Sequence, residues 1–146
     1  MGCEYVWQDR AVLKTFTGFL SGSAFIQTAE AVAAHPRFDG LQVIYNDFSG
    51  IDGHSIDAST YARSAACRLG AMVTNPNFRV VFIARSGDAQ ALLQVVQPSL
   101  RGAPFDPFVC NSLDEAHTWF DQQGLLDAPR GLRWHAAPNA SGRPAR

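Results

Sequence analysis

The sequence of 146 residues predicts a single α/β domain built on a mixed, largely parallel sheet. Short apolar runs typical of strands alternate along the chain with longer segments in which apolar residues recur every three or four positions, as on one face of a helix. The hydrophobic content of 47% suits one core of ordinary size. The predicted order of elements is β-β-α-β-α-β-α-β-α, with the helices packed on the sheet.

The first two strands should form an antiparallel hairpin. Apolar or alternating runs at residues 5–7 and 11–17 flank Gln8-Asp9-Arg10, which predicts a turn near Asp9. A helix should follow from Ser21 or Ser23, either of which is an acceptable N-cap. Later strands are joined through helices and should therefore run parallel, so the hairpin adds an antiparallel edge to the sheet.

The next strand is expected at residues 41–48, followed by a turn and by the longest helix, which should begin near Ser55. The apolar stripe expected on that helix consists of Ala58, Tyr61, Ala62, Ala65, Ala66, Leu69, Met72 and Val73. Arg63, Ser64 and Arg68 lie largely off the stripe and are expected outside the core.

The remaining elements have clear boundary signals. Residues 80–84 form an apolar, β-branched run that predicts a strand covered on both faces. Ser86-Gly87-Asp88 should cap the next helix, and residues 108–110 predict a short strand. Ser112 and Glu115 have the spacing of a capping box, which predicts the last helix.

The composition argues against several classes of protein function. A formal net charge of -1 gives no electrostatic footprint for nucleic acid, and three separated cysteines suggest neither disulfides nor a metal site. No secretory leader and no apolar stretch of about 20 residues is seen, so we expect a cytoplasmic protein without a membrane span. No cofactor is implied. Residues 1–124 are predicted to form the domain, and the Ala/Pro/Arg-rich residues 125–146 a flexible tail.

The order of elements, the sequence DFSGI after the middle strand and the closing SLDEAHTWF resemble the SpoIIAA-like (STAS or SEC14-like) bacterial domains over about residues 4–123. The resemblance implies a compact mixed sheet and a role in binding proteins or an apolar ligand. It favours a non-enzymatic interaction or regulatory domain that binds a protein partner, which includes self-association as a homodimer. The alternative is a small apolar-ligand or lipid binder, with a pocket between the sheet and the helix that follows Ser55.

Anti-sigma-factor antagonists of this family carry Asp-Ser-Ser-Gly-Leu after the middle strand and are phosphorylated on a serine there. The chain departs from that motif, because the corresponding residues read Asp52-Gly53-His54-Ser55-Ile56. Ser55 is the closest match to the phosphoacceptor, while the second serine and the Gly-Leu pair are missing.

Polar residues should gather where the parallel strands end, because ligands of open parallel sheets bind at the carboxyl ends of the strands. The candidate binding or regulatory residues at this rim are Asp47, Ser49, Asp52, His54, Ser55 and Arg85. A purely structural interpretation also fits, with Ser55, Asp88 and Ser112 as helix N-caps. A serine hydrolase using His54 is a distant third hypothesis, because no nucleophile elbow is present.

Overall fold

The computed structural model describes residues 2–85, 87–96 and 108–122. Five strands form one sheet: β1 (Gly2–Gln8), β2 (Ala11–Leu20), β3 (Val43–His54), β4 (Arg79–Ile83) and β5 (Phe108–Cys110). The helices are α1 (Gly22–Ala33), α2 (Ala58–Ala71), α3 (Gly87–Val96) and α4 (Leu113–Gln122), with a short 3-10 helix η1 (Phe38–Gly40) before β3. The predicted tail, residues 125–146, lies outside the described residues.

The sheet has the order β1-β2-β3-β4-β5. β1 and β2 are antiparallel, and every other neighbouring pair is parallel. The hairpin turn falls at Asp9, whose φ of 50° is left-handed, as two-residue hairpin loops require. The predicted fold class, the element order and the antiparallel hairpin are therefore confirmed.

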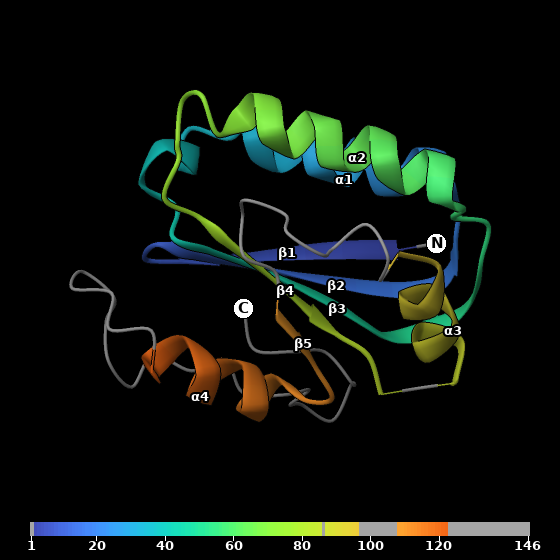
Figure 1. Cartoon of the computed structure of the whole chain (residues 1–146). Helices are drawn as coiled ribbons and strands as arrows, with labels where there is room; N and C mark the ends of the chain where they lie inside the picture. Colours follow the sequence, from blue (N-terminus) through green and yellow to red (C-terminus); the bar gives the residue numbers. More distant parts are fainter. Residues whose placement is uncertain (1, 86, 97–107, 123–146) are drawn as a thin grey trace.

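Helices cover both faces of the sheet, as Figure 1 shows. α1, α2 and α3 pack on one face, where Phe25, Tyr61 and Leu92 meet strand residues in one buried cluster. α4 packs on the opposite face, where Ala116 and Phe120 contribute to a second cluster. Both faces of β4 are thus covered, which explains its continuous apolar sequence.

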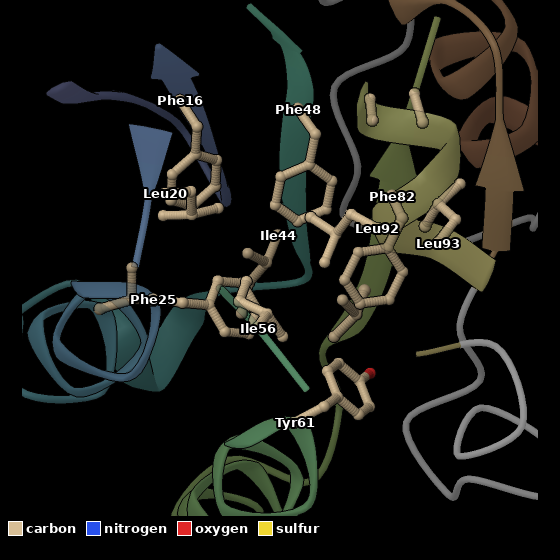
Figure 2. Packing of buried hydrophobic residues seen from close by; sticks show 14 of the residues in the cluster. Phe16, Leu20, Phe25, Ile44, Phe48, Ile56, Tyr61, Phe82, Leu92 and Leu93 are labelled. Carbon is tan, nitrogen blue, oxygen red and sulfur yellow. The ribbon is translucent and has the colours of Figure 1, made fainter. Parts of the chain in front are cut away.

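Aromatic rings fill the core beneath α1, α2 and α3 (Figure 2). Phe48 of β3 lies between Phe16 and Phe82 of the neighbouring strands, with ring centroids 5.1 Å and 5.9 Å away. Phe25 of α1 stacks on Tyr61 of α2 at 6.3 Å. These separations are typical of favourable aromatic pairs, so one ring cluster connects three strands to two helices.

β3 is longer than the sequence predicts. It was expected to end at residue 48, yet it continues to His54, because β2 also extends and pairs with it as far as Leu20 and His54. Gly50 permits this extension, since a Cβ there would lie only 2.9 Å from the carbonyl oxygen of Phe16. The segment expected to be a turn is therefore mostly strand.

The buried face of α2 also differs from the expectation. Its buried residues are Tyr61, Ser64 and Arg68, whereas Leu69 is 48% exposed and Val73 is 89% exposed. The predicted placement of Ser64 and Arg68 outside the core is thus wrong. The helix is rotated so that a serine and an arginine face the sheet, where aromatic rings surround the guanidinium group.

The last helix brings one further correction. Helical periodicity in the sequence predicts that His117 lies on a solvated face of α4, but the side chain is 1% exposed and meets the ring of Tyr45 edge-on at 5.5 Å. The N-cap of α4 is as predicted, because the N–H of Glu115 donates to Ser112 Oγ at 3.1 Å. The Glu115 carboxylate accepts from the N–H of Asn111, one residue earlier than in a standard capping box.

Candidate functional site

The six candidate residues fall in two groups along the rim. Asp47 is opposite Ile83, the last residue of β4, and Arg85 follows two residues later. His54, by contrast, is opposite Leu20 at the far tip of the β2–β3 pair. At about 3.3 Å per residue, the seven residues from Asp47 to His54 span roughly 20 Å. The rim therefore contains two separate polar regions rather than one compact site.

The first region consists of Asp47, Ser49 and Arg85. The Asp47 carboxylate accepts a hydrogen bond from the N–H of Ser49 at 2.9 Å, and both residues are half-buried. Within the described part of the chain, no ion pair joins Asp47 to Arg85, and Arg85 is exposed to solvent.

The second region, the tip of the β2–β3 pair, carries Asp52, His54 and Ser55. Asp52 and Ser55 are exposed, and His54 is half-buried. His54 Nδ1 accepts a hydrogen bond from the N–H of Ile56 at 3.0 Å. Among the described residues no hydrogen bond connects His54 to a serine hydroxyl, so the structure does not form the base–nucleophile pair that a serine hydrolase needs.

Ser55 links the two junctions at which α1 and α2 begin. Its Oγ accepts a hydrogen bond from the N–H of Gly22, the first residue of α1, at 3.3 Å. Its own N–H donates to the carbonyl of Leu20 at 3.0 Å. The hydroxyl of Ser55 therefore lies at the N-terminus of α1, where the helix dipole favours negative charge.

The caps of α2 and α3 differ from the expectation. The N-cap of α2 is Asp57, whose carboxylate accepts a hydrogen bond from the N–H of Thr60 at 2.7 Å. Hydrogen bonds from the backbone and the side chain of Thr60 lower the pKa of Asp57. Ser55 instead accepts a hydrogen bond from the first residue of α1, so its predicted role as the N-cap of α2 is wrong. Asp88 lies within the first turn of α3 rather than before it.

The sequence interpretation missed two buried cations beneath α1 and α2. Lys14 of β2 is 1% exposed, and its Nζ donates to Thr28 Oγ1 of α1 at 3.0 Å. Burial first, and then the charge of Arg68, lower the pKa of Lys14 to about 7. Strand alternation was the signal available, because it places Lys14 on the same face as Val12 and Phe16.

Arg68 of α2 is 5% exposed and lies among aromatic rings. Its guanidinium carbon is 5.6 Å to 5.7 Å from the ring centres of Phe25, Tyr61 and Phe82. A guanidinium nitrogen also lies 3.5 Å from the hydroxyl of Tyr61. Cation–π attraction therefore offsets part of the cost of burying this charge.

Lys14 and Arg68 line one small cavity of about 20 Å³, together with Cys67 and apolar side chains. The cavity lies toward the amino ends of the strands, since Ile44 near the start of β3 and Phe78 just before β4 also line it. It is thus at the opposite end of the strands from the rim. A volume of this size holds about one water-sized species and not a lipid.

The sequence matches no protein-family model and no curated protein. Solved structures do match the fold. The anti-sigma factor antagonist SpoIIAA in its unphosphorylated form is similar with a TM-score of 0.54 and 13% identity, over 85% of this chain and 100% of that chain. An anti-sigma factor antagonist from Mycobacterium paratuberculosis is similar with a TM-score of 0.55 and 14% identity, over 81% of this chain and 92% of that chain.

The chain has the SpoIIAA-like fold. The resemblance inferred from the sequence is confirmed at the level of the fold. Within the SpoIIAA-like fold of this chain, Ser55 follows the last residue of β3 and precedes α2. No helix of the described segments is both long and apolar enough to cross a membrane.

Proposed function

We propose that the chain is a non-enzymatic regulatory domain that binds a protein partner through the tip of the β2–β3 pair. The observation that carries this proposal is the exposed residue Ser55, whose hydroxyl accepts a hydrogen bond from the N–H of Gly22 at the start of α1, across 3.3 Å. The SpoIIAA-like fold supports it, because two structures of that fold are anti-sigma factor antagonists. The class of partner proposed is therefore an anti-sigma factor.

Phosphorylation of Ser55 is the proposed means of regulation. A phosphate adds about two negative charges and three acceptor oxygens. At Ser55 these would lie near the N-terminus of α1, which stabilises an anion, while the exposed Asp52 and Asp57 beside it would add to the negative potential. The surface presented to a partner would therefore become more negative locally without a change in fold.

Asp47, Ser49 and Arg85 form the second part of the proposed surface. Because Asp47 and His54 lie roughly 20 Å apart along β3, a partner must span both regions to contact all six candidate residues. A standard interface covers about 800 Å² on each partner, which is wide enough for that span. A second copy of the chain is another proposed partner, and the proposed location is the cytoplasm.

Affinity measurements with Ser55 variants test this function. Purified candidate anti-sigma factors are titrated into the wild-type chain, Ser55→Ala and Ser55→Asp. We expect Ser55→Ala to bind and Ser55→Asp to bind at least about tenfold more weakly, as for a charge buried in an interface. Thr74→Asp, which adds the same charge at an exposed position beyond the other end of α2, should bind like the wild type. Equal affinity of all four proteins would remove Ser55 from the mechanism.

A small apolar-ligand binder is the second candidate function. The cavity lies between the sheet and α2, which is the position expected for such a ligand. The cavity volume of about 20 Å³ restricts the ligand to a very small one. Native mass spectrometry of freshly purified protein tests this function. A reproducible added mass that matches a neutral apolar compound would support this function, and protein that is repeatedly without one would count against it.

A further inference from the structure

Lys14 is the only lysine in the sequence, and the structure buries it. The other 11 of the 12 lysine and arginine residues are arginines. Of the three N–H donors of its ammonium group, one is directed to Thr28 Oγ1 at 3.0 Å. The nearby rings of Phe16 and Phe25 lie 5.4 Å and 5.7 Å from Nζ and offer only their π-faces. The ammonium group thus retains donors for another acceptor.

Arg68 places a second positive charge at the same cavity. Arg68 is 5% exposed, and although burial lowers the pKa of its guanidinium group, an arginine stays protonated throughout the pH range of folded proteins. Among the described residues that line the cavity, there are two cations and no carboxylate. The two charges repel each other, which is one cause of the lowered pKa of Lys14.

We propose that the cavity between β2, α1 and α2 is a binding site for one compact monovalent anion, held by the ammonium group of Lys14 and the guanidinium group of Arg68. The anion would neutralise one buried charge and accept the hydrogen bonds that Lys14 still offers. Chloride and the carboxylate head of a small aliphatic acid share the required chemistry. The site lies at the amino ends of the strands and is independent of the rim and of the proposed function there.

The size and lining of the cavity define the ligand. A volume of about 20 Å³ exceeds the roughly 10–15 Å³ that one water molecule needs, and it is too small for a phosphate ester or a lipid. The lining away from the cations is apolar and includes Val32, Phe38 and Phe78. Such walls disfavour strongly hydrated ions such as sulfate, because burying them would remove water that the walls cannot replace.

The single lysine gives a direct measurement. Protein labelled with ¹³C-lysine shows one set of lysine Cε–Hε signals, which belongs to Lys14. Sodium chloride, bromide, formate and acetate are titrated near pH 6, below the pKa of Lys14, and at constant ionic strength against sodium gluconate, whose anion is too large for the cavity. We expect a saturable change in the Lys14 chemical shift with at least one halide or carboxylate. The relative affinities for halides and carboxylates then distinguish a chloride site from a carboxylate site. A shift that is linear and equal for all anions, gluconate included, would overturn the proposal.

Variants of α2 assign the response to the site. Arg68→Met keeps the observed lysine but removes its neighbour's charge, and it should weaken binding at least about tenfold, as expected for loss of a charge-assisted hydrogen bond. Arg63→Met, at an exposed position of the same helix, should leave the affinity unchanged. Unaltered binding in Arg68→Met would contradict the proposal.

A second readout remains available if Arg68→Met fails to fold. Crystals of the wild-type chain soaked in sodium bromide should show anomalous density within hydrogen-bond distance of Lys14 Nζ. Density there without an anomalous signal would identify a water only, and would overturn the anion site. Bromide found on the surface and not in the cavity would be an adventitious ion only, and this result would also overturn the anion site.

Discussion

The Nζ of Lys14 donates a hydrogen bond to Thr28 Oγ1 across 3.0 Å, in the interior between β2 and α1. The groups that face this amine are Cys3 of β1 and the α2 residues Cys67 and Arg68, and of these Arg68 has the largest effect on its pKa. Burial has a larger effect than any of them. Protonation of this amine therefore couples the stability of the fold to pH near neutrality.

The first prediction is that stability rises with pH above neutrality. A lysine in the unfolded chain titrates near pH 10.4, whereas the pKa of Lys14 in the folded chain is about 7. Between these values the unfolded chain holds a proton that the folded chain has released. The free energy of unfolding should therefore increase by up to about 1.4 kcal/mol per pH unit.

Urea unfolding at pH 6.5, 7.5 and 8.5 in gluconate buffer measures this slope. The series stops at pH 8.5 because burial raises the pKa of Cys3 and Cys110, and ionisation of these thiols in the unfolded chain would then favour unfolding. In Lys14→Met the rise should disappear, and the variant should be more stable than the wild type at pH 6.5. An equal slope in both proteins would mean that Lys14 titrates as an exposed lysine.

The second prediction concerns the extension of β3. In Gly50→Ala the new methyl group would lie 2.9 Å from the carbonyl oxygen of Phe16, so the backbone of β2 or β3 must move. We expect a loss of about 1–3 kcal/mol of stability. Gly40→Ala is the matched control, because a Cβ added at this position would have nothing within 4 Å, and the effect on stability should stay within about 0.5 kcal/mol. Equal effects of the two substitutions in denaturant unfolding would argue against the extended strand.

The third prediction separates the roles of Ser55 and Asp57. The N–H of Thr60 donates a hydrogen bond to the Asp57 carboxylate. Asp57→Ala should therefore speed amide hydrogen exchange at Thr60, and it should lower the melting temperature because α2 loses its N-cap. Ser55→Ala should instead speed exchange at Gly22, at the start of α1. Faster exchange at Thr60 in Ser55→Ala would restore Ser55 as the cap of α2.

The sequence predicted the fold well because local patterns determine it. The hairpin turn at Asp9, the short strand β5 and the cap at Ser112 all follow from residue types at fixed spacing. The end of β3 could not be predicted in this way. It depends on Gly50 lying against Phe16 of another strand, which is a contact between residues far apart in the sequence.

The buried cations were missed for a related reason. Periodicity treats Arg68 as a surface residue, because a lone charge in a core is costly. Here the rings of Phe25, Tyr61 and Phe82 come from three different elements and together surround the guanidinium group. Only the assembled fold shows that environment, whereas Lys14 could have been found from strand alternation alone.

The proposed function requires that a protein partner binds at the tip of the β2–β3 pair. The most direct test is a ¹⁵N NMR titration of the wild-type chain with a purified anti-sigma factor that binds it. We predict that the largest shift changes fall on Asp52, His54, Ser55 and Gly22. A complex whose shift changes are confined to α4, on the opposite face of the sheet, would contradict the account.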